Sequence, residues 1–467
     1  MRVPRVVAAA LFIAGCSDAT APRAERPHIL TAAVAANPDN VLSAIVSVRL
    51  TRADSMAVRF APAGTPLLDA TPAVLPTADS AVALVLGLLP EMRYALQVVA
   101  WGGGRSYSGD ILTFTTGALP EDLPSYDAAG SDPAPGYVVF AAGSYGIVID
   151  NDGRVVWYHR FPNGPGLNFQ PQPNGRYTAR PLPTNSADPA AWVEIDLLGR
   201  VTRSFGCAGG LQPRFHDMIA RPDGSYWILC DETRIMDLSA IGGVAAARVT
   251  GTVVQHVGAD GEVLFEWSPF GHFAIEDLPA TERTGTDVNW THGNALDLDA
   301  DGNLLVSFRS LSEVTRVDTR TGGVLWRMGG LANQFVFTDR VGSSEPAFSG
   351  QHGVRITGPH ELLLLDNLGN DNGTRAERYA YDTELRLAEQ IASYGSSPSV
   401  IGQLGGSTQQ IADGHVLVAF GNGGRVEEYD AAGRMVWRIE QPGYVFRAYR
   451  IRSLYGGPGG FATGAGG

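Results

Sequence analysis

A repeated turn dominates the chain from residue 137 onward. Each copy has an apolar residue, an Asp, a short turn that usually contains Gly, and an apolar run that often ends in Trp. Two strands joined by such a turn form a β-hairpin. Copies of this unit occupy residues 149–157, 195–201, 258–267, 317–326, 381–386 and 429–437. The period limits the chain to a repeated β-structure, because a single hairpin cannot bury its apolar face.

A second turn unit alternates with the first. Its copies lie at residues 173–177, 222–227, 300–306, 357–363 and 412–417. Two hairpins per repeat make a four-stranded blade, and six outer hairpins predict a six-bladed β-propeller over residues 137–455. The first inner hairpin is missing before residue 137, and residues 445–451 can supply its strands. The ring would then close without open sheet edges, followed by a Gly-rich tail over residues 456–467.

The composition favours an all-β chain. Its 57 Gly and 29 Pro would interrupt helices repeatedly, because both residues are unfavourable in helix interiors. Hydrophobic residues make up 44% of the chain, which argues against disorder.

A smaller domain is predicted before the repeat. Residues 30–118 alternate apolar and polar positions between turn residues, as in a β-sandwich. Tyr94 begins a late strand, and the pattern resembles the fibronectin type III domain, in which such a Tyr forms a corner hydrogen bond. We expect a structural role for this domain. Residues 119–136, rich in Pro and Asp, form the linker to the propeller.

The N-terminal segment has the pattern of a bacterial export signal. Two Arg residues precede an apolar stretch that is too short to span a bilayer as a mature helix. The sequence Ile-Ala-Gly-Cys that ends residues 1–16 resembles the lipobox of bacterial lipoproteins, which implies lipidation of Cys16 and a tether over residues 17–29. Ser17 favours the outer membrane, at its periplasmic face or at the cell surface. An ordinary signal peptide that ends near a Cys is the alternative.

Two further cysteines, Cys207 and Cys230, would lie outside the cytoplasm in an exported protein. There such a pair can form a disulfide, worth about 3 kcal/mol by loop-closure entropy. Two buried free thiols are the alternative.

The charge of the chain excludes several functions. The formal net charge is −13, from 35 basic and 48 acidic residues. This balance argues against a general nucleic-acid binder, which must neutralise phosphates. All 35 basic residues are Arg, so Schiff-base chemistry on Lys and a Walker P-loop are excluded.

Three of the nine histidines share nearly the same position in the repeat. His216, His292 and His352 each lie a few residues before the turn of an inner hairpin, and Thr408 has the equivalent position in a later repeat. The starts of the innermost strands of a propeller cluster at one mouth of its channel, so we expect these side chains to converge. Arg309 ends an inner strand, where its guanidinium fork could bind a tetrahedral oxyanion. Taken singly, each residue also has a structural explanation, as an ion pair, a turn residue or a solvated side chain.

These motifs together resemble the bacterial arylsulfate sulfotransferases. The resemblance covers roughly residues 137–455, and its motifs are specific as a group but weak singly. The similar stretches are residues 291–294 (THGN), 301–309 (DGNLLVSFR), 324–330 (VLWRMGG), 351–352 (QH), 365–367 (LDN) and 374–375 (TR).

The resemblance implies a role for each matching residue. His352 would attack sulfur and carry the sulfuryl group, while His216, His292, Asn294 and Arg309 would hold the sulfate oxygens. Thr408, or its neighbour Ser407, matches a last polar contact less closely. A neutral imidazole is a good nucleophile near neutral pH, so this chemistry is plausible for these residue types.

The implied reaction moves a sulfuryl group from a phenolic sulfate ester to a phenol by a ping-pong mechanism. It needs no cofactor, no metal and no nucleotide sulfate donor. The partners would be small phenolic molecules, with membrane contact only through the lipid anchor, and the oligomeric state stays open.

Three other functions are compatible with a propeller. A quinoprotein-like dehydrogenase would share the Trp-containing repeat, although an acidic Ca²⁺ cluster is not evident in the sequence. A metal-dependent lyase or hydrolase could use the three histidines as zinc ligands, although Arg309 would oppose a cation. A non-enzymatic scaffold of the outer membrane would make the histidines incidental.

Overall fold

The computed structural model describes residues 26–162, 164–182, 191–343, 346–369, 373–440 and 442–456. The predicted signal peptide, Cys16 and most of the predicted tether and Gly-rich tail lie outside these residues. The described chain is all-β, as predicted, with short 3₁₀ turns as its only helices. No helix in this part of the chain is long and apolar enough to cross a membrane.

The chain divides into two compact units. The first contains Val46–Ala83, Tyr94–Thr113 and the described residues up to Val34, and the second contains Ala35–Ile45, Leu84–Arg93 and the residues from Phe114 onward.

The first unit is built from two antiparallel sheets. One has the order β1-β2-β5 and the other has the order β4-β3-β6-β7. Strand β1 begins at His28, whose ring stacks on Tyr107 with ring centroids 5.7 Å apart. The strands are β1 (His28–Ala36), β2 (Ala44–Thr51), β3 (Ser55–Pro62), β4 (Asp69–Ala70), β5 (Ser80–Val85), β6 (Arg93–Gly102) and β7 (Arg105–Thr115).

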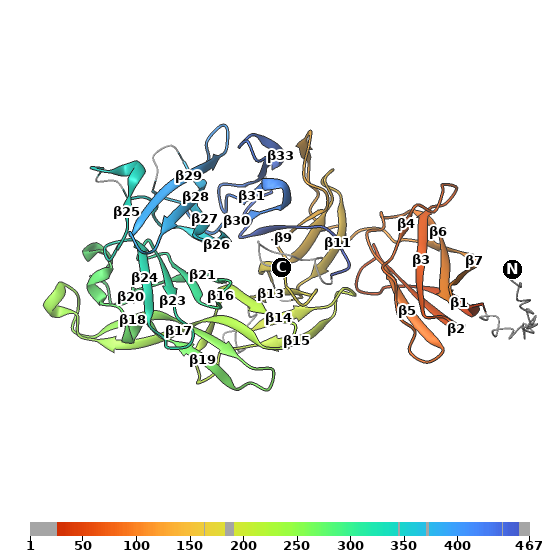
Figure 1. The fold of residues 1–467 in the computed structure, drawn as a ribbon, viewed down its shortest axis with the longest axis horizontal. Coiled ribbons are helices and arrows are strands. Elements are labelled where there is room, and N and C mark those ends of the chain that lie inside the picture. Colours follow the sequence, from red (N-terminus) through yellow and green to blue (C-terminus); the bar gives the residue numbers. More distant parts are fainter. Residues whose placement is uncertain are drawn as a thin grey trace, which may run out of the picture. The chain divides into compact units, whose positions relative to one another are not determined.

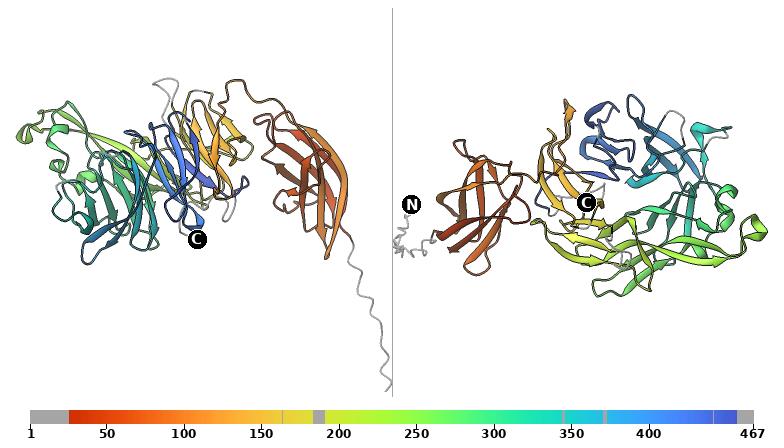
Figure 2. Two further views of the ribbon diagram at one scale, coloured as in Figure 1. Left: turned by 90° about the horizontal axis from the view of Figure 1, so that it is seen from above. Right: turned by 180° about the vertical axis from the view of Figure 1, so that it is seen from behind.

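The second unit contains six sheets with four main antiparallel strands each. Figure 1 shows them around a common centre, and the view from behind in Figure 2 gives the same succession. The first three sheets comprise β9 (Tyr137–Ala142), β10 (Tyr145–Ile149), β11 (Val155–Arg160) with β34 (Ala448–Ile451); β12 (Gly166–Pro171), β13 (Tyr177–Pro181), β14 (Trp192–Ile195), β15 (Val201–Phe205); and β16 (Gln212–Ala220), β17 (Tyr226–Met236), β18 (Ala247–Val257), β19 (Val263–Trp267).

The other three sheets follow the same antiparallel order. They comprise β21 (Gly293–Leu298), β22 (Leu304–Phe308), β23 (Glu313–Val317), β24 (Val324–Gly329); β26 (His352–Gly358), β27 (Glu361–Asp366), β28 (Arg375–Asp382), β29 (Leu387–Gly395); and β30 (Ser407–Gln410), β31 (Val416–Ala419), β32 (Arg425–Tyr429), β33 (Met435–Glu440).

Short elements join the edges of these sheets or connect them. They are β8 (Ala128–Gly130) on β33, β20 (Asp287–Asn289) on β18, β25 (Val336–Phe337) on β29, and the 3₁₀ turns η1 (Ser239–Ile241), η2 (Pro269–Gly271), η3 (Ile275–Asp277), η4 (Ala280–Glu282), η5 (Thr338–Arg340) and η6 (Ala412–Gly414).

The innermost strands contact one another in a closed succession. It runs β34, β12, β16, β21, β26, β30 and back to β34. Strand β34 pairs with β9, so a segment near residue 450 completes the sheet of β9–β11. The second unit is therefore propeller-like, and residues far apart in the sequence meet where the inner strands begin.

The Asp/Gly turns are held by the repeated side chains themselves. Asp150, Asp196 and Asp430 each accept two backbone N–H bonds of 2.9–3.0 Å within their turns. An Arg four positions later pairs with each carboxylate, namely Arg154, Arg200 and Arg434. The Gly before each Arg has a φ of 77–88°, a conformation that residues with a Cβ rarely adopt. The residues that repeat in the sequence are therefore the ones that form and stabilise these turns.

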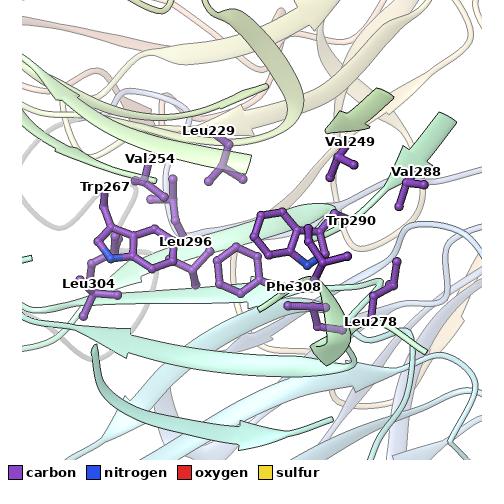
Figure 3. Packing of buried hydrophobic residues seen from close by; sticks show 14 of the residues in the cluster. Leu229, Val249, Val254, Trp267, Leu278, Val288, Trp290, Leu296, Leu304 and Phe308 are labelled. Atoms are coloured by element: carbon purple, nitrogen blue, oxygen red, sulfur yellow. The ribbon is translucent and has the colours of Figure 1, made fainter. Parts of the chain in front are cut away.

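Apolar side chains fill the space between neighbouring sheets. Figure 3 shows the cluster between the sheet of β16–β19 and the sheet of β21–β24, with Trp267, Trp290 and Phe308 at its centre. Trp290 and Phe308 are buried, and they lie two residues before His292 and directly before Arg309 in the sequence. The packing of this core therefore fixes the backbone beside His292 and Arg309, two of the predicted site residues.

Cys207 and Cys230 form a disulfide bond, with their Cα atoms 6.1 Å apart. The bond links the segment after β15 to β17, beside the apolar cluster that contains Trp192 and Phe205.

Candidate active site

Three histidines from three different sheets meet at the centre of the second unit. His216 lies in β16, His292 directly precedes β21, and His352 is the first residue of β26. The Nε2 atoms of His216 and His292 are 3.1 Å apart, and the rings of His216 and His352 have centroids 6.4 Å apart. His216 and His352 are buried, and His292 is half-buried. The expected convergence of these side chains is present in the structure.

The backbone around His292 is held in one conformation. His292 has a φ of 48°, and a Cβ on Gly293 would lie 2.6 Å from the side chain of Thr252. The hydroxyl of Thr252 accepts the Gly293 N–H at 2.8 Å, and the hydroxyl of Thr291 accepts the Thr252 N–H at 2.8 Å. The THGN motif therefore encodes a tight junction between β18 and β21 that places the His292 ring.

The hydrogen bonds of His352 determine which ring nitrogen carries the proton. Its Nδ1 lies 2.9 Å from Oδ1 of Asn367 and 3.1 Å from the carbonyl oxygen of Gly350. The amide nitrogen of Asn367 donates to the carbonyl oxygens of Gly402 and Gly405, so Oδ1 faces the ring. Both partners of Nδ1 are acceptors, so Nδ1 must carry the hydrogen. Nε2 of His352 is therefore left with a lone pair.

All three imidazoles are neutral near pH 7. Burial lowers the pKa of His352 to about 3, and the bond to Asn367 opposes that shift only in part. Burial likewise lowers the pKa of His292 to about 2 and that of His216 well below its ordinary value. Arginines add to these shifts, because a nearby cation disfavours a second positive charge. Arg214 acts on His216 and His292, and Arg309 acts on His292 and His352.

The guanidinium of Arg309 makes few hydrogen bonds with the described residues. It directly follows β22, and its backbone N–H donates to the carbonyl oxygen of His292 at 3.0 Å. Its Nη2 is 3.4 Å from the carbonyl oxygen of Gln403, and its buried Nε has no partner among the described residues. A cation with spare donors beside three neutral imidazoles is suited to bind an anion.

Asn294 supports the His352 segment. It is fully buried, and its amide donates to the carbonyl oxygen of Gln351 at 2.6 Å. Its own Oδ1 is buried without a partner in the part of the chain that the structure describes. Asn294 thus fixes the backbone directly before His352.

Ser407 and Thr408 take part in contacts between strands. The hydroxyl of Thr408 donates to the carbonyl oxygen of Gly353 at 3.0 Å, and that of Ser407 donates to Ala448 at 3.2 Å. Both side chains are buried. These bonds hold β26, β30 and β34 together, so the hydroxyl protons are already used.

Two residues of the site were missed by sequence reasoning. Asn367 lies in the LDN stretch, but its distance in sequence from His352 gives no sign of their contact. Arg447 is 1% exposed, donates to the carbonyl oxygen of Asn294 at 2.6 Å and pairs with Asp217 at 3.0 Å. Its positive charge also lowers the pKa of His216 and His352. It precedes β34, which stands outside the repeat, so no pattern marked it.

A metal-dependent enzyme is the alternative function that would use the three histidines as ligands. Among the described residues, no group of three or more His, Cys, Asp or Glu side chains is arranged to hold a metal ion. The arginines that depress the pKa values of the three histidines would also repel a cation.

No curated protein matches the chain. A protein of unknown function from Bacteroides caccae is similar at 12% identity and a TM-score of 0.44, over 68% of this chain and 100% of that chain. An inactive virginiamycin B lyase from Staphylococcus aureus, solved with quinupristin, is similar at 12% identity and a TM-score of 0.36, over 69% and 89%. Regucalcin from Agrobacterium tumefaciens, a calcium-binding protein, reaches 17% identity and a TM-score of 0.33, over 72% and 95%.

A family model matches the part of the chain that contains the candidate active site. The model described as Arylsulfotransferase (ASST) matches residues 213–442, which include all three histidines, Arg309 and Asn367. Over this segment, which carries the candidate active site, the chain is similar to the arylsulfotransferase family.

Proposed function

We propose that this protein moves a sulfuryl group from a phenolic sulfate ester to a phenol, through a covalent intermediate on His352. The observation that carries the proposal is the bonding of the His352 ring. Nδ1 donates to two fixed acceptors, so Nε2 keeps its lone pair beside two neutral imidazoles and near Arg309. A nucleophile and an anion-binding cation in one buried cluster suit transfer of an anionic group.

In the first half-reaction, Nε2 of His352 attacks the sulfur of the aryl sulfate. The N–S bond forms, the S–O(aryl) bond breaks, and the phenolate leaves with the bonding electrons. The ring then carries a sulfuryl group on Nε2 and a hydrogen on Nδ1, which is the charge of an imidazolium. Asn367 and Gly350 stabilise that charge, because both accept from Nδ1. Arg309 offsets the charge on the sulfate oxygens.

In the second half-reaction, a phenol attacks the same sulfur. The new S–O bond forms, the N–S bond breaks, and His352 returns to its neutral form. The proton of the phenol is lost to solvent, because burial and the nearby arginines lower the pKa values of His292 and His216 too far for either ring to hold it near pH 7. Because the first phenol leaves before the second enters, the kinetics are ping-pong. The sulfate ester itself supplies the sulfuryl group, so no nucleotide donor is required.

Aromatic side chains beside His216 suit an aryl substrate. Phe215 stacks on the His216 ring at 4.1 Å, and Phe446 contacts it edge-on at 5.7 Å. Tyr444 contacts Phe446 at 6.3 Å and is 45% exposed. A row of rings that leads from solvent to the cluster offers stacking surfaces to a phenol.

The proposal is tested by the release of p-nitrophenol from p-nitrophenyl sulfate, with and without added phenol. We expect release to depend on the acceptor, and double-reciprocal plots at several phenol concentrations to be parallel. Equal release without acceptor would indicate a hydrolase. A folded protein that releases no phenol with any donor and acceptor pair would overturn the proposal.

Replacing Asn367 by Ala should lower kcat about 100-fold while KM for the donor changes little. The substitution removes the closer of the two acceptors that hold the hydrogen on Nδ1 of His352 and leaves only the carbonyl oxygen of Gly350, so the tautomer with the lone pair at Nε2 is less favoured. Steady-state kinetics measure the effect. Asn422→Ala is the matched control, because Asn422 holds Leu404 in the same region but does not contact His352. Equal losses in both variants would mean that Asn367 only supports the fold.

The architecture and location complete the proposal. We propose that the six sheets are the blades of a six-bladed propeller and that the first unit is a fibronectin type III-like sandwich.

Cys16 would carry a lipid anchor that holds the protein at the outer membrane of a bacterium. Loss of radiolabelled palmitate from a Cys16→Ser variant is the expected result, and unchanged labelling would rule the anchor out.

A further inference from the structure

Asn289 is an exposed polar residue that contacts the candidate active site from outside the repeated turns. It is the last residue of β20, and its amide nitrogen Nδ2 lies 2.6 Å from Nδ1 of His292. An amide nitrogen can only donate a hydrogen bond, so Nδ1 of His292 is the acceptor. Burial keeps the pKa of His292 low and the ring neutral near pH 7, and a neutral ring has a single N–H. That hydrogen must therefore be on Nε2 of His292.

The hydrogen on Nε2 of His292 lies between two rings. Nε2 of His216 is 3.1 Å away, so the N–H of His292 donates to a lone pair on that atom. The His216 ring then carries its own hydrogen on Nδ1, which is buried and has no partner among the described residues. The bond from Asn289 thus determines the hydrogen positions of two of the three site histidines.

Backbone pairing holds Asn289 within reach of His292. Asn289 lies opposite Thr250 in the parallel pair of β18 and β20, and the N–H of Trp290 donates to the carbonyl oxygen of Thr250 at 3.0 Å. Trp290 is buried in the apolar core, whereas Asn289 is exposed. The contact with His292 can therefore be changed at the protein surface without removing any side chain from the core.

The charges around His292 give this N–H a use. The field of Arg309 acts on the rings of both His292 and His352, so these three side chains lie close together. An anionic sulfate oxygen among them is a stronger hydrogen-bond acceptor than the neutral nitrogen of His216. A lone pair on Nε2 of His292 would instead repel the same oxygen. The hydrogen position that Asn289 selects therefore lets His292 assist Arg309.

We propose that Asn289 is a positioning residue, which holds the hydrogen of His292 on Nε2 so that His292 donates to an oxygen of the sulfuryl group during transfer. The inference rests on the proposed function and deepens it, because it assigns the donating atom and the residue that selects it. When the sulfate ester binds, the N–H of His292 exchanges Nε2 of His216 for a sulfate oxygen. No proton is transferred in this step. Asn289 acts through His292 and not on the substrate itself.

Asn289→Asp tests the hydrogen position directly. The carboxylate has nearly the shape of the amide but only accepts hydrogen bonds, so it should draw the hydrogen of His292 to Nδ1. Nitrogen NMR of protein with isotope-labelled histidine, at about pH 8 and so above the ordinary histidine pKa of about 6.5, separates protonated from unprotonated ring nitrogens. We expect a protonated Nε2 in the wild type and a protonated Nδ1 in Asn289→Asp. The signals of His292 are identified by their loss in His292→Asn, since Asn tolerates the positive φ at this position.

Kinetics separate positioning from a structural role. With p-nitrophenyl sulfate and phenol, kcat/KM should fall about threefold in Asn289→Ala, which favours neither hydrogen position, and roughly 30-fold in Asn289→Asp, which favours the wrong one. A structural role predicts the opposite order, since Asp preserves the size of Asn. Asn422→Asp is the matched control for the added charge, because Asn422 is also exposed and its bond to Leu404 uses an oxygen that Asp retains. We expect this control to keep the wild-type kcat/KM.

The two measurements can fail separately. A hydrogen on Nδ1 of His292 in the wild type, or one that stays on Nε2 in Asn289→Asp, would overturn the inference even if transfer to phenol is normal. Equal kcat/KM in Asn289→Asp and Asn422→Asp, or a larger loss in Asn289→Ala than in Asn289→Asp, would also overturn it. The expected move of the hydrogen, in a protein that transfers no sulfuryl group, would keep the control of His292 by Asn289 and overturn the proposed function.

Discussion

Replacing His352 by Ala should lower the rate of sulfuryl transfer by roughly four orders of magnitude or more. The variant lacks the atom that bonds to sulfur, and enzymes that lose a covalent nucleophile keep only what binding and fixed donors contribute. The cavity left by the ring does not restore the reaction, because a water molecule there is a far weaker nucleophile than an imidazole lone pair. Initial rates of p-nitrophenol release in the presence of phenol measure the loss.

Two further measurements tie that loss to the chemistry of His352. Wild-type protein quenched in alkali after exposure to donor alone should yield a peptide that contains His352 and has gained the mass of one sulfuryl group. His360→Asn serves as the control, because His360 lies exposed at the turn after β26 and Asn tolerates its φ of 63°. A residual rate in His352→Ala close to that of this control would exclude His352 as the nucleophile.

The pH dependence of kcat/KM should reflect the lowered pKa of His352. The free enzyme needs the neutral ring, which is protonated only as the pH falls toward about 3. The rate should therefore stay level between pH 7 and pH 5, where an imidazole with the ordinary value of 6.5 would lose most of its neutral form. A decline centred near pH 6.5 would mean that the site is less shielded from water than the buried ring indicates.

The sequence predicted the parts of the fold that repeat. The Asp-Gly-Arg turns are visible because the same side chains close each turn, and their period indicated repeated four-stranded sheets. The convergence of His216, His292 and His352 followed from their common position before the inner turns. Local chemistry that recurs along a chain can be read without knowing the tertiary structure.

Contacts that occur only once in the fold could not be predicted from the repeat in the sequence. Asn367 sets the proton on His352 across two strands, β26 and β27, and only the register of that pair brings them together. Arg447 lies directly before β34, the strand that completes the sheet of β9–β11 and stands outside the repeat. Ser407 and Thr408 had the expected position in the repeat, yet their hydroxyls bond to neighbouring strands. Position in a repeat predicts proximity to the channel, but not the direction of a hydrogen bond.

Replacing Arg309 by Gln should lower kcat/KM for p-nitrophenyl sulfate by about 100- to 1,000-fold, which corresponds to about 3–4 kcal/mol of lost transition-state stabilisation. Within the described part of the chain, the guanidinium has a single long contact, 3.4 Å to the carbonyl oxygen of Gln403, and its Nε has no partner, so its donors are available to the sulfate oxygens. Arg309→Lys keeps the charge but loses the planar fork, and it should fall between the wild type and Arg309→Gln.

The loss at Arg309 should be specific to the anion. Inorganic sulfate, as a competitive inhibitor, should bind more weakly to Arg309→Gln than to the wild type, because the sulfate oxygens lose their main cation. Arg320→Gln is the control, since Arg320 is an exposed Arg at the turn between β23 and β24 that pairs only with Asp318 among the described residues. If sulfate inhibits the two Gln variants equally, the fixed charge beside His292 and His352 must come from Arg447 or Arg214, whose fields also lower the pKa values of these rings.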